Sequence, residues 1–137
     1  MILAHGFGGT ADAGLDPYAR MFAESGMHAI IFDYRHFGSS EGEPPQLVSI
    51  RHQLQDWHAA VAFARSQEGI DAERIVLWGM SLSGGHVIHV AARDRRISAI
   101  IAQFPMLDGL AALRNILGYA GYGQILKLMS AGIREFS

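Results

Sequence analysis

The stretch that decides the fold is WGMSLSGG, residues Trp78–Gly85, at the end of the apolar run Ile75–Trp78. The run predicts a buried strand, and residues 82–93 are predicted to form a helix that opens directly from the turn. Ser81 therefore stands on a strand-to-helix turn that is rich in glycine. Three explanations are open for it: a nucleophile, part of a phosphate-binding loop, or a small residue in a tight turn.

Strands and helices alternate along the rest of the chain. Apolar runs predict further strands at residues 2–4, 28–33 and 97–103. Apolar periodicity and capping residues predict helices at residues 16–25 with Asp16 as N-cap, 47–64, 110–117 and 124–136. This alternation predicts an α/β fold with a parallel sheet, which binds ligands at the carboxyl ends of its strands. Three glycine-rich loops lie at that edge, after Ala4, Asp33 and Trp78.

Composition excludes several classes of function. The chain has 137 residues, a net charge of −2 and no cysteine. A clustered basic surface for nucleic acid is not expected, and no thiol can act as nucleophile or metal ligand. No apolar run is long enough to span a membrane, and Met1–His5 is too short for a signal peptide. We expect a cytoplasmic protein, a location that the absence of disulfides permits.

Two ligand-binding patterns compete with a nucleophile. Gly79 and Gly84 have the spacing of a P-loop, but Gly85 and His86 follow where that loop needs Lys and then Ser or Thr. Gly6-x-Gly8-x-x-Ala11 matches a dinucleotide-binding turn, with Asp33 as the acid for the ribose. That second pattern leaves the glycines around Ser81 unexplained.

A nucleophile explains both of these glycine-rich loops. Residues 79–83 read G-x-S-x-S, one residue from the G-x-S-x-G elbow that projects a serine hydroxyl from a strained turn. An oxyanion hole needs one backbone N–H after the nucleophile, here Leu82, and one from a loop after an earlier strand. His5–Gly9 is such a loop, and Phe7 is its expected donor.

These motifs resemble the α/β-hydrolase superfamily of esterases, lipases and serine peptidases. The matching stretches are HGFGGT (5–10), FDYRHFGSSEG (32–42) and WGMSLSGGHV (78–87). The resemblance implies a three-layer α/β/α sandwich that is truncated at both ends. It implies a partial core over residues 1–108 and the start of a helical cap over residues 109–137.

The family also implies a Ser-acid-His triad in that chain order. No histidine follows position 89, and we expect none of the seven to serve as base: His5, His28, His36, His52, His58, His86 and His89. Asp108 stands where some members of the family place their acid, but we expect it to be the N-cap of the helix that begins near Leu110. Asp33 and Arg35 are expected to form a structural ion pair.

The sequence therefore predicts a serine hydrolase acting on a small ester or amide. Ser81 would attack the carbonyl, the Phe7 and Leu82 amides would hold the oxyanion, and no cofactor or metal is implied. The acid and base would lie outside this chain, which alone would be inactive. The alternative is a non-catalytic α/β binding module, possible for a chain without its base.

Overall fold

The computed structural model describes residues 1–112, 114–115 and 117–119. The chain divides into two compact units, Met1–Leu107 and Asp108–Ser137. In the second unit, residues 109–112, 114–115 and 117–119 are helical, as expected for the first of its two helices. The expected helix at 124–136 lies outside the described residues.

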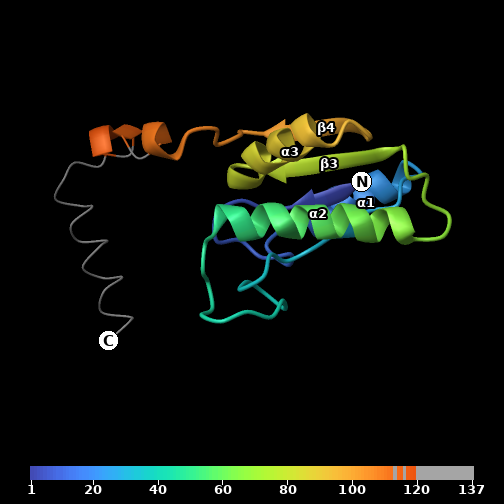
Figure 1. Cartoon of the computed structure of the whole chain (residues 1–137), viewed down its shortest axis with the longest axis horizontal. Helices are drawn as coiled ribbons and strands as arrows, with labels where there is room; N and C mark the ends of the chain where they lie inside the picture. Colours follow the sequence, from blue (N-terminus) through green and yellow to red (C-terminus); the bar gives the residue numbers. More distant parts are fainter. Residues whose placement is uncertain (113, 116, 120–137) are drawn as a thin grey trace. The chain divides into compact units, whose positions relative to one another are not determined.

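The first unit is built on a parallel sheet (Figure 1). Its four strands run in the order β2-β1-β3-β4. Their bounds are Ile2–Ala4 for β1, Ile30–Ile31 for β2, Ile75–Met80 for β3 and Ile97–Gln103 for β4. The carboxyl ends of β1 and β3 lie side by side, because Ala4 pairs with Gly79. The glycine-rich loops that follow these two strands therefore meet at one edge of the sheet.

Helices cover both faces of the sheet, which confirms the expected three-layer sandwich. Helix α1 (Asp16–Glu24) packs through Tyr18 and Phe22 against the face that carries Leu3 and Trp78. Helices α2 (Ile50–Ser66) and α3 (Leu82–Arg93) pack on the opposite face, which carries Ile2, Ala4, Ile75 and Leu77. Alternate strand residues point to opposite faces, so a nearly continuous apolar run serves both layers.

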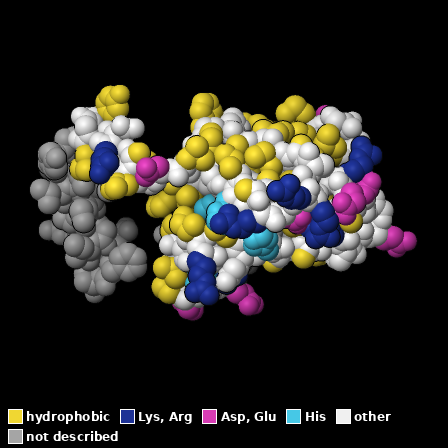
Figure 2. All heavy atoms as spheres, turned by 45° about the horizontal axis from the view of Figure 1, so that its top comes forward, with side chains coloured by type: hydrophobic (Ala, Val, Ile, Leu, Met, Phe, Trp, Pro, Cys, Tyr) yellow, Lys and Arg dark blue, Asp and Glu magenta, His cyan; other side chains and the backbone are white. Residues whose placement is uncertain are grey.

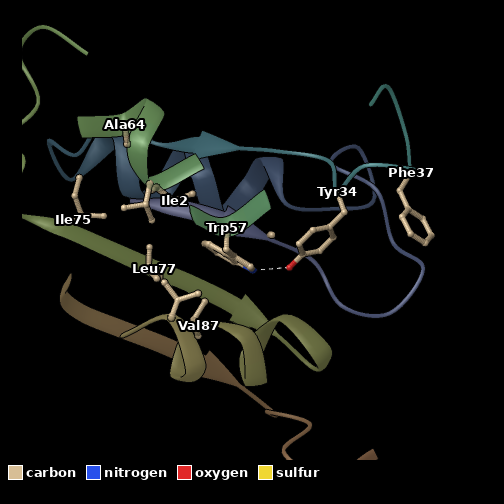
Figure 3. Packing of buried hydrophobic residues seen from close by; sticks show 11 residues of the cluster. Ile2, Tyr34, Phe37, Trp57, Ala64, Ile75, Leu77 and Val87 are labelled. Carbon is tan, nitrogen blue, oxygen red and sulfur yellow. Dashed lines mark hydrogen bonds between the residues drawn. The ribbon is translucent and has the colours of Figure 1, made fainter. Parts of the chain in front are cut away.

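Trp57 of α2 is at the centre of the larger core. Its side chain is completely buried between α2 and the sheet, close to Leu77 and Val87 (Figure 3). Its indole nitrogen donates a hydrogen bond of 2.7 Å to the hydroxyl of Tyr34, which follows β2. The bond fixes the loop after β2 to the body of α2.

Three boundaries differ from the predictions. Helix α2 begins at Ile50 behind the N-cap Ser49, and Leu47, expected in its apolar stripe, precedes the helix and is exposed. Leu15 occupies the N-cap position of α1 in place of Asp16, which lies in the first turn. Strand β2 has two residues where residues 28–33 were expected, because only Ile2 and Leu3 of the short β1 lie opposite it.

The outer side of β4 is open and apolar. Figure 2 brings this side forward and shows hydrophobic side chains gathered on it. Ile101 is 41% exposed although its neighbour in the sheet, Trp78, is buried. No helix among the described residues has the length and apolar character needed to span a bilayer.

Candidate functional site

Ser81 has the backbone conformation of a strained turn. Its φ is +54° and its ψ is −116°, a region that residues with a side chain rarely occupy. It links the last residue of β3 directly to the first residue of α3. Its hydroxyl neither caps α3 nor bonds to any other described residue. The turn therefore presents a free hydroxyl at the carboxyl edge of the sheet.

The strained turn is held from the adjacent strand. The Ser81 amide donates to the carbonyl of Gln103 at 2.9 Å, and the Ser81 carbonyl accepts from the Met106 amide at 2.9 Å. The segment after β4 can cross α3 this closely because the third and fourth residues of α3, Gly84 and Gly85, are glycines. A Cβ on Gly84 would lie 2.9 Å from the Cα of Pro105, and one on Gly85 would lie 2.4 Å from the Met106 carbonyl oxygen.

Two other glycines permit close contacts around Ser81. A Cβ on Gly6 would lie 2.9 Å from the Ser81 Cβ and 3.5 Å from its Oγ. A Cβ on Gly79 would lie 2.3 Å from the carbonyl oxygen of Ser83. Gly6 therefore brings the loop after β1 against Ser81, and Gly79 lets the chain turn back onto itself.

The amides of Phe7 and Leu82 belong to the two segments that meet at this serine, the loop after β1 and the start of α3. Leu82 follows Ser81 directly, and Phe7 follows the glycine that contacts it. Neither amide donates a hydrogen bond to another residue in the described part of the chain. Both N–H groups are therefore without an acceptor among the described residues.

His5 supports the loop that carries Phe7. The ring is 2% exposed, lies edge-on to Tyr34, and would be only 2.7 Å from a Cβ on Gly9. Its Nε2 lies 3.7 Å from Asp33 Oδ1. Burial lowers the pKa of His5, and the Gly6 carbonyl and Asp33 partly oppose that shift. His5 is thus a packed, structural residue.

The expected ion pair between Asp33 and Arg35 is wrong. Arg35 instead binds Asp56 of α2, with its Nε 2.7 Å and its Nη2 2.6 Å from Oδ1. Asp33 accepts from the Ala11 amide at 2.6 Å and from the Ser39 amide at 2.9 Å. Asp56 was missed because it is 21 residues from Arg35, and no local pattern connects the two.

In the dinucleotide-binding alternative, Asp33 was the acid that would bind the ribose, and the structure uses this carboxylate differently. Both oxygens of the Asp33 carboxylate accept hydrogen bonds from the protein, and the bond from Ala11 joins the loop after β1 to the loop after β2. Residues 11–14 form a turn, so no helix begins at the third position of the pattern. A helix N-terminus directed at a pyrophosphate is therefore lacking there.

None of the seven histidines forms a hydrogen bond with Ser81. His86 bonds Gln53 inside the core, with 2.9 Å between Nε2 and Oε1. The rings of His36 and His52 stack on each other with their centroids 5.7 Å apart. His28 and His58 are exposed, and His89 is half-buried on α3. Ser81 therefore lacks the hydrogen bond to an imidazole that a serine activated by a base would form.

The remaining expectations concern Asp108 and metals. Asp108 Oδ1 accepts from the amides of Leu110 and Ala111 at 2.9 and 3.0 Å, so this carboxylate caps the following helix. Among the described residues, no group of three or more His, Asp or Glu side chains is arranged to hold a metal ion.

The buried His86 predicts a pH-dependent stability. Burial, reinforced by His89, lowers its pKa from 6.5 to about 4. As the pH falls below about 6.5, His86 binds a proton in the unfolded chain but not in the folded protein. The contribution of His86 to the free energy of unfolding is therefore fully present above this pH and is lost as the pH decreases. We expect the free energy of unfolding to drop by about 2 kcal/mol between about pH 7.5 and about pH 5.

Urea titration of the wild type and His86→Gln at both pH values tests this expectation. The variant should lose most of the pH dependence. His28→Gln, at an exposed position, should keep it. Equal pH dependence in wild type and His86→Gln would assign the effect to other groups.

Comparison with known proteins agrees with the fold. The quorum-quenching protein AidA of Acinetobacter baumannii is 48% identical over 112 residues, 82% of this chain and 37% of that protein. The thiohydrolase aneE of Aspergillus aculeatus is 39% identical over 108 residues, 79% of this chain and 34% of that protein. The α/β hydrolase GrgF of Penicillium superposes with a TM-score of 0.75 at 30% identity, over 94% of this chain and 46% of that one.

The chain thus spans less than half the length of each of these relatives. A family model described as serine aminopeptidase S33 matches residues 1–132. The parallel sheet with helices on both faces is that of an α/β hydrolase. The chain therefore belongs to the serine aminopeptidase S33 family of α/β hydrolases.

Proposed function

We propose that this chain carries the nucleophile and the oxyanion hole of a serine hydrolase that cleaves carboxylic esters. The observation that supports this most strongly is the positive φ of +54° at Ser81. A serine pays this conformational cost only where the surrounding structure enforces it, and such strain is concentrated at functional sites. The Ser81 hydroxyl and the amides of Phe7 and Leu82 make no hydrogen bonds within the described residues, so they remain available for the proposed reaction.

The reaction would follow the acyl-enzyme route. Ser81 Oγ attacks the ester carbonyl carbon as a base takes its proton, and the carbonyl oxygen becomes an oxyanion. The amides of Leu82 and Phe7 donate to this oxyanion, each worth about 3 kcal/mol in the transition state. The C–O bond then breaks, the alcohol leaves with the proton, and water releases the acid by the reverse sequence.

The residues that activate Ser81 are proposed to lie outside these 137 residues. No histidine of the chain reaches the Ser81 hydroxyl, and a serine without a base is a weak nucleophile at neutral pH. Asp108 is occupied by the helix that it caps. A further chain segment or a partner chain would have to supply an imidazole and its carboxylate.

The isolated 137-residue chain is accordingly expected to hydrolyse an activated ester no faster than a Ser81→Ala control. Release of p-nitrophenol from a short-chain p-nitrophenyl ester measures this rate. Turnover at rates typical of esterases, about 10 per second, would show that a base is present within the chain.

The decisive experiment is capture of the protein from its native source with a tagged fluorophosphonate. We expect labelling at Ser81, identified by peptide mass, on a protein whose intact mass exceeds that of 137 residues. An unlabelled protein of 137 residues would favour the non-catalytic binding module. An oxoester, a thioester and an aminoacyl anilide should then be compared, because one relative is named a thiohydrolase and the family model a serine aminopeptidase.

A further inference from the structure

Ser83 is the residue at which the turn departs from the G-x-S-x-G pattern, and it is completely buried. Its Oγ forms a hydrogen bond with the hydroxyl of Tyr34, which is 49 residues away in sequence. The Tyr34 oxygen also accepts the hydrogen bond from Trp57 Nε1 at 2.7 Å, seen as a dashed line in Figure 3. Ser83 therefore stands where the G-x-S-x-G pattern has its second glycine, and its side chain forms a hydrogen bond there.

The chemistry of the three groups fixes the direction of these bonds. An indole nitrogen can only donate, so Tyr34 accepts from Trp57 and has one hydrogen left to donate. Tyr34 is only 2% exposed, and Ser83 Oγ is the acceptor that the structure offers this hydrogen. Burial raises the pKa of Tyr34, so the hydroxyl stays protonated and donates at any physiological pH.

These bonds connect three separate parts of the fold to the strained turn. Trp57 is in α2, Tyr34 follows β2, and Ser83 is in the first turn of α3, two residues after Ser81. The Ser83 carbonyl also lies against Gly79, on the other side of the turn. Movement of Ser83 would therefore move the backbone on both sides of Ser81, including the Leu82 amide.

We propose that Tyr34 and Ser83 are positioning residues that hold the strained turn at Ser81, and through it the direction of the Leu82 amide. Neither residue touches substrate, since both side chains are buried. The catalytic part of this inference rests on the proposed hydrolase function; the mechanical part does not. A counterintuitive consequence is that Ser83→Gly, which restores the G-x-S-x-G pattern, should impair this protein.

Amide hydrogen exchange in the 137-residue chain tests the mechanical part. The reporters are the amides of Ser81 and Met106, whose hydrogen bonds close the turn. In Ser83→Gly we expect their exchange to be about fivefold faster, the effect of one buried hydrogen bond. In Tyr34→Phe, which also removes the acceptor of Trp57, we expect an increase at least as large. The amides of Arg74 and Ile30, which bond in distant turns and strands, should be unchanged.

Ser98→Ala is the matched control, because it also removes one serine hydrogen bond, from Ser98 Oγ to the Ile75 carbonyl, but at the other end of β3. It should leave the reporters unchanged. Two results would overturn the proposal: unchanged exchange at the turn in both variants, or an equal rise at all protected amides. Because Tyr34→Phe keeps the ring in the core, it remains informative if Ser83→Gly does not fold.

Ester hydrolysis by the native protein tests the catalytic part. Each single variant should lower kcat at least about fivefold with KM unchanged. The double variant should be no slower than Tyr34→Phe, because both changes break the Tyr34–Ser83 bond and only Tyr34→Phe also removes the acceptor of Trp57. Unchanged kcat in both variants, or losses that add, would contradict a positioning role. If the wild type is inactive and unlabelled, the proposed function fails, while faster exchange at the turn still supports the Tyr34–Ser83 bond.

Discussion

Ser81→Ala is expected to abolish fluorophosphonate labelling of the native protein and to lower its ester kcat by about 10⁴-fold or more. Ser81 Oγ is the atom that would form the acyl bond, and no neighbouring hydroxyl can replace it. Ser83 is bonded to Tyr34 and completely buried. Residual hydrolysis would come from the oxyanion hole and substrate binding alone.

This loss should occur without unfolding. Ser81 Oγ makes no hydrogen bond within the described residues, and alanine has the same Cβ at the strained φ. We therefore expect the free energy of unfolding to change by less than about 0.5 kcal/mol. The turn would remain in place with its nucleophile removed.

Ser25→Ala is a suitable control for this experiment, because Ser25 is an exposed serine at the end of α1. Labelling and turnover should remain at the wild-type level. A Ser81→Ala protein that is still labelled would show that another residue is the nucleophile. The strain at Ser81 would then be architectural.

The sequence predicts the local features of the fold well. The bounds expected for α3 and β4, Leu82–Arg93 and Ile97–Gln103, are those observed. Each has a clear signal: α3 follows a glycine-rich turn, and β4 is a compact run of apolar residues. The spatial meeting of the loops after β1 and β3 follows from parallel strand order, which places both loops at one edge.

Contacts between distant segments are what the sequence does not show. The choice of Asp56 over Asp33 as partner of Arg35 depends on how α2 lies against the loop after β2. The bond between Tyr34 and Ser83 depends on the packing of Trp57. Neither contact has a periodic or motif signal, because tertiary packing determines which polar side chains meet.

Gly79→Ala is expected to have the largest effect on stability. The new methyl group would lie 2.3 Å from the carbonyl oxygen of Ser83, 2.5 Å from its carbonyl carbon and 2.9 Å from the Gly84 nitrogen. These are backbone atoms, so no side chain can rotate to relieve the contact. We expect the free energy of unfolding to fall by about 3 kcal/mol, at the upper end of the cost of overpacking.

Urea unfolding followed by tryptophan fluorescence measures this change, since Trp57 and Trp78 are both buried. Gly109→Ala is the matched control: it adds the same methyl group to a glycine with open space around it and no positive φ. Its stability should change by less than about 0.5 kcal/mol.

Gly79→Ala also tests whether the turn at Ser81 requires the close approach of Gly79 to Ser83. Gly79 pairs with Ala4 on one side and Ala102 on the other, so it cannot move without breaking the centre of the sheet. The strain must then be released by Ser83, and the Tyr34 bond and the angle at Ser81 should change with it. A Gly79→Ala protein as stable as wild type, with full fluorophosphonate labelling, would mean that the turn tolerates displacement. That result would refute the requirement for a close approach between Gly79 and Ser83.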